Sequence, residues 1–313
     1  MKETIYDLAI IGGGPAGMSA GIYAGRYRLK TVLLTKDIGG TCNTAHTVEN
    51  YPGFKSISGA ELMKKFKDHL DDYDVEVKLE EVQGIIKEQG KYILISKKGK
   101  YKAKSVILAL GTQRRKLNIP GEREFLGKGV SYCATCDARF FRNKIVGVVG
   151  GSDTAVTSAL LLSEYASRVY IIYRKERLRA EPIWVEKLEK NPKIQTIFQT
   201  NVLKILGNNL VTKIKLDKAY QGSKELRLDG LFIEIGAYPA VGLAKILGVK
   251  LNKADLVIID DACQTNVEGI YAAGDVVAGF GNLKQIITAA ASGAIAVTSA
   301  YKWLLTKKRK VKS

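Results

Sequence analysis

The chain carries the same glycine-rich turn twice, and each copy follows an apolar run of strand length. The first copy comes directly after residues 6–11 and reads Gly-Gly-Gly-Pro-Ala-Gly over residues 12–17. This G-x-G-x-x-G pattern is typical of a dinucleotide-binding βαβ unit, whose helix points its N-terminus at the phosphates. We expect a side chain at Gly12 to occupy the space of the pyrophosphate. The predicted phosphate contacts are Gly12, Gly14, Pro15, Ala16 and Gly17.

The second copy lies 138 positions later, so that the βαβ unit is an internal repeat. The repeat pairs Gly12 with Gly150, Gly13 with Gly151, Gly14 with Ser152 and Gly17 with Ala155. The flanking strand-like runs keep the same register in both copies, which chance would rarely produce. The sequence therefore predicts an α/β protein with two Rossmann-like dinucleotide-binding domains. The contacts predicted in the second turn are Gly150, Gly151, Ser152, Asp153 and Thr154.

A C-x-x-C pair, Cys133 and Cys136, precedes the second turn. Four cysteines are too few for a disulfide scaffold in 313 residues, so a redox role is favoured over a structural one. A zinc site would need two more ligands, and the sequence has neither a second C-x-x-C nor an H-x-x-H. Neighbouring cysteines at the start of a helical turn ionise readily and can attack a disulfide. Cys42 and Cys263 are interpreted as small buried hydrophobic residues, with Cys42 also a candidate neighbour of a flavin.

The residue that ends the second strand of each βαβ unit indicates which nucleotide is bound. An acidic residue there usually holds the ribose 2′-hydroxyl, but the first unit ends in Thr35 and the second in Tyr173. The second end continues with cations suited to a 2′-phosphate, which favours NADPH; the alternative is a solvated basic strand end. The residues predicted to contact this nucleotide are Tyr173, Arg174, Lys175 and Arg179.

A third signal is the short strand that ends in Gly274-Asp275 before a helix-like stretch at residues 283–305. A carboxylate there could contact the ribityl or phosphate oxygens of a flavin, although an ordinary strand followed by a turn would look the same.

With 46% hydrophobic residues and only 6 prolines, the chain can bury two hydrophobic cores of ordinary domain size, as expected for an enzyme. No run approaches the roughly 18 to 20 apolar residues of a membrane span, so we expect a cytoplasmic protein without a membrane partner. The net charge of +18 favours anionic cofactors and acidic protein partners. No motif supports nucleic-acid binding, and the basic residues 307–312 are interpreted as a solvated terminus.

These motifs together resemble the low-molecular-weight thioredoxin reductases, two-domain members of the pyridine nucleotide-disulfide oxidoreductases. The resemblance covers nearly the whole chain, and its most specific element is Cys-Ala-Thr-Cys-Asp at residues 133–137. It implies FAD and NADPH as cofactors, thioredoxin or a glutaredoxin-like disulfide protein as partner, and a homodimer. It also implies that Cys133 and Cys136 are the redox pair and that Asp137 is the general acid; a helix cap is the other role open to Asp137. The further flavin contacts that it implies are Thr35, Gly40, Thr41, Asn50, Gly111, Thr112, Gly274, Asp275, Lys284 and Gln285.

The repeat and the resemblance predict an inserted domain. Residues 1–114 and 240–313 are expected to form the FAD domain, and residues 117–237 the NADPH domain that carries the C-x-x-C pair. The chain is expected to cross near residues 116–121, where Pro and Gly mark a linker, and to return near residues 236–239.

Two other functions stay open. A ferredoxin- or flavodoxin-type NADP reductase would have no use for the C-x-x-C pair, and a non-enzymatic flavoprotein redox sensor would not turn over NADPH steadily. The chain also departs from the family around the redox pair, where Ala138-Arg139 replaces Gly-Phe and Thr41 replaces a glutamine. These departures leave every electron-carrying group in place.

Overall fold

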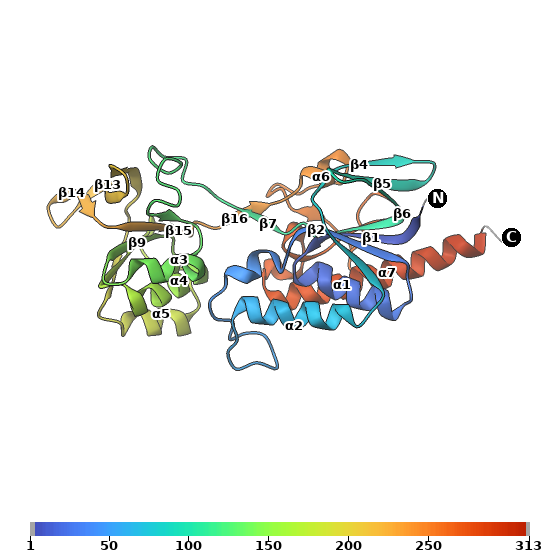
Figure 1. Ribbon diagram of the computed structural model, residues 1–313, viewed down its shortest axis with the longest axis horizontal. Coiled ribbons are helices and arrows are strands. Elements are labelled where there is room, and N and C mark those ends of the chain that lie inside the picture. Colours follow the sequence, from blue (N-terminus) through green and yellow to red (C-terminus); the bar gives the residue numbers. More distant parts are fainter. Residues whose placement is uncertain (1–3, 311–313) are drawn as a thin grey trace. The chain divides into compact units, whose positions relative to one another are not determined.

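The computed structural model describes residues 4–310, which form two compact units (Figure 1). The first unit contains the chain up to Asn43, Val48–Gln113 and the chain from Tyr238 onward. The second contains Thr44–Thr47 and Arg114–Ala237, so it is inserted into the first. Both units are α/β, as the repeat predicts.

The sheet of the first unit has the strand order β3-β2-β1-β6-β5-β4, and β18 pairs with the end of β6. Strands β3, β2, β1, β6 and β18 are parallel, whereas β4 and β5 form an antiparallel meander on β6. Ala9 and Ile10 of β1 lie on opposite faces of the sheet and are both fully buried, because a parallel sheet is covered on both faces. The strands are β1 (Ile5–Gly13), β2 (Thr31–Ile38), β3 (Val75–Leu79), β4 (Val82–Glu88), β5 (Lys91–Ser96), β6 (Lys100–Leu108) and β18 (Ile270–Ala272).

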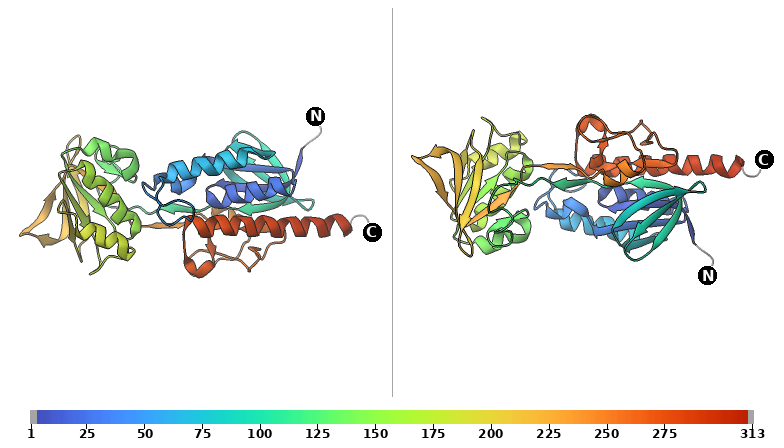
Figure 2. Two further views of the ribbon diagram at one scale, coloured as in Figure 1. Left: turned by 90° about the horizontal axis from the view of Figure 1, so that it is seen from below. Right: turned by 90° about the horizontal axis from the view of Figure 1, so that it is seen from above.

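Helices α1 and α7 of this unit run side by side (Figure 2). Their approach requires a glycine, since a Cβ at Gly293 would stand 2.1 Å from the carbonyl oxygen of Ala16. Helix α2 is capped by Ser58, which accepts a hydrogen bond from the Glu61 amide. The helices are α1 (Pro15–Arg26), α2 (Gly59–Asp71), α6 (Gly242–Ile246) and α7 (Ile286–Lys310), with short elements η1 (Gly40–Thr44), η3 (Gly274–Val276), η4 (Phe280–Asn282), β17 (Val257–Ile258) and β19 (Val277–Ala278).

The second unit contains a parallel sheet of order β11-β10-β9-β15-β8 and an antiparallel sheet β12-β13-β14. In this sheet β10 lies on one side of β9 and β15 lies on the other. The strand order therefore reverses between β9 and β15, and these two strands flank the topological switch point. The strands are β8 (Val130–Ser131), β9 (Ile145–Val149), β10 (Arg168–Ile172), β11 (Ile194–Ile197), β12 (Val202–Gly207), β13 (Val211–Tyr220), β14 (Ser223–Arg227) and β15 (Gly230–Ile233). The helices are α3 (Ala134–Asp137), η2 (Ala138–Phe141), α4 (Asp153–Tyr165) and α5 (Pro182–Glu189).

The predicted repeat is confirmed residue by residue. Ile11 pairs with Leu34 between β1 and β2, and Val149 pairs with Ile172, at the corresponding positions of β9 and β10. Two short strands, β7 (Thr112–Arg114) and β16 (Ala237–Pro239), pair where the chain passes between the units. The linker expected at residues 116–121 lies just beyond them, in the second unit. Among the helices of residues 4–310, none is long and apolar enough to cross a membrane.

Candidate active site

Three of the four glycines of the first turn, those of the G-x-G-x-x-G pattern, meet different constraints. A Cβ at Gly12, where φ is +117°, would stand 2.1 Å from the carbonyl oxygen of Ala109. One at Gly17 would stand 1.8 Å from the carbonyl oxygen of Gly12. A Cβ at Gly14, in contrast, meets nothing closer than 4.0 Å. Gly12 and Gly17 therefore permit close packing, and Gly14 keeps open the space that a phosphate could enter.

The geometry adds a second constraint at Gly12, because a side chain there would collide with the carbonyl group of Ala109, the residue after β6. The N-terminus of α1 fits an anion. Pro15 is its first residue, Gly14 is its N-cap, and no side chain caps the first turn. N–H groups left open in this way bind phosphate well, so the residues present fit the pyrophosphate of a dinucleotide.

Strand β2 continues past Thr35 to Ile38, so the expected strand end is wrong by three residues. Thr35 is buried and donates its hydroxyl hydrogen bond to the carbonyl oxygen of Asp37 at 2.6 Å. The Asp37 carboxylate accepts the amide hydrogen of Gly40 at 3.1 Å and fixes the start of η1. Asp37 is exposed, and it is a carboxylate at this edge of the sheet that was not among the predicted site residues.

Asp275 lies in η3, directly after β18, and interacts with Lys284. Burial raises the pKa of Asp275, and Lys284 opposes this shift. Burial likewise lowers the pKa of Lys284, whose ammonium group donates to the carbonyl oxygen of Val277. Burial and the nearby Asp275 raise the pKa of Cys42 to about 12, so this thiol stays protonated at neutral pH. Cys42, from a distant segment, thus lies near Asp275, which in turn interacts with Lys284 in the first unit.

Two other predicted flavin contacts also meet, since Asn50 donates its amide hydrogen bond to Gln285 Oε1 at 3.2 Å. Gly111 has φ +61° with open space around it, and it accepts the amide hydrogen of Ala240. The remaining predicted contacts in this unit are Gly40 and Thr41, in η1, and Thr112, the first residue of β7.

The second turn repeats the packing of the first. A Cβ at Gly150 would stand 2.2 Å from the carbonyl oxygen of Glu234, which occupies the place that Ala109 has in the first unit. A Cβ at Gly151 would meet the ring of Tyr173 at 2.6 Å. Helix α4 has Ser152 as its N-cap without a side-chain cap, so its first turn can also receive a phosphate.

The cations predicted to bind a 2′-phosphate follow β10. Arg174 and Lys175 are exposed. Arg179 returns to the glycine turn, because its amide donates to the carbonyl oxygen of Gly151 at 2.7 Å and its Nε donates to the Tyr173 hydroxyl at 3.1 Å. The buried Tyr173 therefore orients Arg179 beside the phosphate-binding turn.

The other two predicted residues of this turn differ in exposure. Asp153 is half-buried and accepts the amide hydrogen of Glu181 at 2.6 Å, which ties the segment after β10 to the start of α4. Thr154 is exposed on the first turn of α4.

Cys133 and Cys136 form a disulfide. Cys133 is the N-cap of α3 and its Sγ accepts the amide hydrogen of Cys136 at 3.2 Å. An N–H group aimed at this sulfur favours negative charge there once the disulfide is opened. Cys133 is half-buried and Cys136 is exposed, so Cys136 is the more accessible sulfur of the unit.

Asp137 is connected to the redox pair through Ser131. The Ser131 hydroxyl donates to Asp137 Oδ2 at 2.6 Å and accepts the amide hydrogen of Cys133 at 3.0 Å. Asp137 is half-buried and does not cap its own helix, whose N-cap is Cys133. It is therefore a carboxyl group held beside the disulfide.

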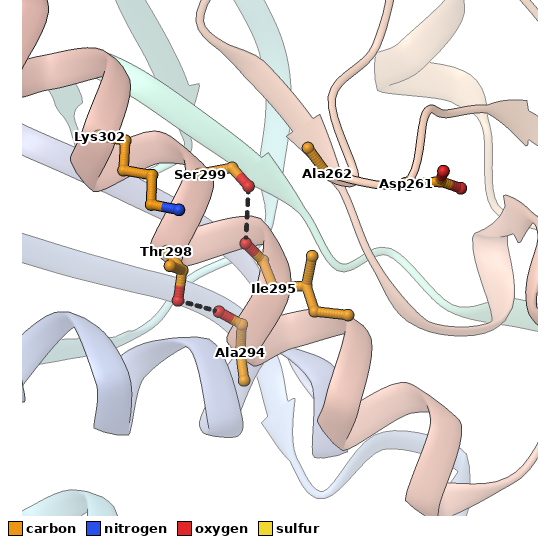
Figure 3. Close-up of a pocket in the computed structure, with 7 residues that line it drawn as sticks. All are labelled: Asp261, Ala262, Ala294, Ile295, Thr298, Ser299 and Lys302. Atoms are coloured by element: carbon orange, nitrogen blue, oxygen red, sulfur yellow. Dashed lines mark hydrogen bonds between the residues drawn. The ribbon is translucent and has the colours of Figure 1, made fainter.

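The remaining features do not add a second reactive centre. Cys263 is buried, and burial with the nearby Asp260 raises its pKa to about 12. Within residues 4–310, no group of three or more His, Cys, Asp or Glu side chains could hold a metal ion. The depression in Figure 3 has a volume of about 460 Å³ and is lined by Asp261, Ala262 and one face of α7. It contains none of the predicted site residues.

One pair of charged residues, Arg114 and Glu234, was not among the site residues predicted from the sequence. Arg114 Nη1 lies 3.4 Å from Glu234 Oε2, and Nη2 donates to the Thr44 hydroxyl at 2.7 Å. Glu234 is 7% exposed, and burial raises its pKa to about 7 although Arg114 and Ser158 lower it. The sequence repeat gives no signal for Glu234, because the offset of 138 does not align it with Ala109; only the structure shows that Glu234 follows β15 where Ala109 follows β6.

Comparison with known proteins gives a consistent result. Residues 6–293 match the family described as pyridine nucleotide-disulphide oxidoreductase. The thioredoxin reductase of Treponema pallidum (strain Nichols) is 40% identical, over 97% of this chain and 99% of its own length. The thioredoxin reductase of Peptoclostridium acidaminophilum is 38% identical, over 96% of this chain and 98% of its own length. The solved thioredoxin reductase of Lactococcus lactis has a TM-score of 0.91 at 38% identity, covering 96% of this chain and 99% of that chain.

Proposed function

The chain belongs to the pyridine nucleotide-disulphide oxidoreductase family, and on this premise we propose that it passes two electrons from NADPH through FAD to the Cys133–Cys136 disulfide. The dithiol then reduces thioredoxin or a similar small disulfide protein. The observation that carries this proposal is the disulfide itself, with an exposed sulfur, an amide aimed at the other sulfur and a carboxyl group beside it. We also propose a cytoplasmic homodimer, from the family resemblance.

The two nucleotide turns provide the binding. The open backbone at Gly14 and the uncapped start of α1 would hold the FAD pyrophosphate, with Asp275 and Lys284 nearby in the same unit. When bound, FAD supplies a carrier that accepts a hydride and returns two electrons. The turn at Gly150–Ser152 would hold NADPH, with Arg174, Lys175 and Arg179 on its 2′-phosphate.

The residues of the redox pair account for the disulfide chemistry. Two electrons and two protons convert the disulfide to a dithiol, and the amide of Cys136 favours a thiolate at Cys133. Cys136, next to Asp137, is the thiol that would contact the flavin, and the Cys133 thiolate would attack the partner's disulfide and form a mixed disulfide with it. Cys136 then attacks Cys133, which releases the reduced partner and restores the disulfide. Asp137, linked to Cys133 through Ser131, would give a proton to a departing thiolate.

The decisive experiment is a steady-state assay of purified protein with NADPH and thioredoxin. We expect turnover to require both cysteines, so that Cys133→Ser and Cys136→Ser each abolish disulfide reduction. Electron transfer from NADPH to an artificial acceptor should remain largely intact, because it uses only the nucleotide sites. Wild-type rates of disulfide reduction in either variant would show that the pair is structural. Reduction of the pair without continuous turnover would favour the redox-sensor alternative.

A further inference from the structure

Glu234 is a buried acid for which the electron relay has no use. It follows β15, donates its amide hydrogen to the carbonyl oxygen of Val149 and packs its own carbonyl against Gly150. At the equivalent place in the first unit stands Ala109, which has no functional group. The second unit therefore differs from its repeat by one carboxylate at the edge of the nucleotide turn.

The contacts of this carboxylate are long. Arg114 Nη1 lies 3.4 and 3.5 Å from its two oxygens, and the Ser158 hydroxyl lies 3.4 Å from Oε1. Charge-assisted hydrogen bonds are normally about 2.7 to 2.9 Å long, and a carboxylate can accept about four hydrogen bonds. Glu234 therefore retains acceptor capacity although it is 7% exposed. A buried carboxylate with so little compensation is stabilised by any further donor.

The strand order tells which part of a nucleotide would reach Glu234. The cations expected to bind the 2′-phosphate follow β10, and the pyrophosphate turn follows β9. Since β15 lies on the other side of β9, a dinucleotide that crosses the switch point brings its nicotinamide half toward the end of β15. The carboxamide of nicotinamide carries two N–H donors, which match a carboxylate that can only accept.

We propose that Glu234 binds the carboxamide amino group of the nicotinamide and so orients the ring of a bound pyridine nucleotide. This inference rests on the proposed use of a pyridine nucleotide. Arg114 is the charged side chain that faces Glu234, and its role is to keep the carboxylate ionised and in place.

The test is equilibrium binding to the flavin-loaded protein, measured by calorimetry at pH 8. The probes are NADP⁺, its 3-acetylpyridine analogue, in which a methyl group replaces the amino group, and adenosine 2′,5′-bisphosphate, which lacks the nicotinamide half. We expect Glu234→Ala to weaken NADP⁺ binding roughly tenfold to a hundredfold, as for the loss of one hydrogen bond to a charged group. Binding of the analogue and of the bisphosphate should change little.

Two variants keep the outcome interpretable. Glu234→Gln retains a carbonyl acceptor, so it should recover part of the NADP⁺ affinity. Glu225→Ala removes an exposed glutamate of the same unit, on β14, and should bind all three probes like the wild type. Equal loss of all three probes in Glu234→Ala, or equal loss of NADP⁺ and the analogue, would overturn the proposal. The proposed function fails separately, if the wild type binds NADP⁺ but NADPH and NADH do not reduce its flavin.

Discussion

Replacing Glu234 by glutamine should stabilise the protein relative to the wild type, and this gain should be larger at alkaline pH than at acidic pH. The side chain is almost fully buried, and burial holds its pKa near 7, whereas an ordinary glutamate titrates near 4.5. Between pH 4.5 and pH 7, the folded state therefore keeps the Glu234 proton, whereas the unfolded chain has already released it. Stability from this group is fully present below pH 4.5, falls as the pH rises and is lost above about 7.

The size of the effect follows from the two pKa values. Each pKa unit corresponds to about 1.36 kcal/mol, so the ionised carboxylate lowers the free energy of unfolding by about 3 kcal/mol at pH 8. Glutamine has nearly the same shape and carries no charge, so it removes this cost. The gain is an upper limit, because the variant also deprives Arg114 of its carboxylate.

Thermal unfolding of wild type and Glu234→Gln between pH 5 and pH 8 measures this difference. At pH 8 the variant should unfold at a higher temperature, by up to roughly 10 °C, and the difference should shrink toward pH 5. Glu225→Gln is the control, since Glu225 is exposed and its ion pair with Lys213 contributes less than about 1 kcal/mol. A difference between Glu234→Gln and wild type that does not vary with pH would refute the argument from burial.

Three further predictions concern the nucleotide turns and the redox pair. Gly12→Ala should lower both stability and FAD content, because its Cβ would meet Ala109 at 2.1 Å; Gly14→Ala should keep the fold, as thermal unfolding and flavin absorbance will show. Arg174→Ala should raise the KM for NADPH about tenfold to a hundredfold and change the KM for NADH little. Equal changes in the two KM values would mean that Arg174 is exposed to solvent and does not contact the 2′-phosphate. Asp137→Asn should slow disulfide reduction by on the order of 10²-fold while flavin reduction is unchanged, and a wild-type rate would remove Asp137 as the acid.

The sequence alone determined the fold class, the repeat and the redox pair. These depend on local patterns: apolar runs of strand length, glycines at fixed spacing and two cysteines on one helical turn. Each acts over a few residues, so it can be read without knowing which segments are neighbours. The offset of 138 positions even predicted the register of the strands in the second unit, where Val149 pairs with Ile172 as Ile11 pairs with Leu34.

The tertiary structure decided what depends on contacts between distant segments. It placed Asp275 near Lys284 and Cys42, and joined Asn50 to Gln285. It also showed why a side chain is excluded at Gly12, because the carbonyl group that it would meet belongs to Ala109, the residue after β6. Glu234 shows the same limit, because its sequence neighbours are those of an ordinary strand end. Only its burial in the folded unit, opposed by Arg114 and Ser158, raises the pKa of this carboxyl group to about 7.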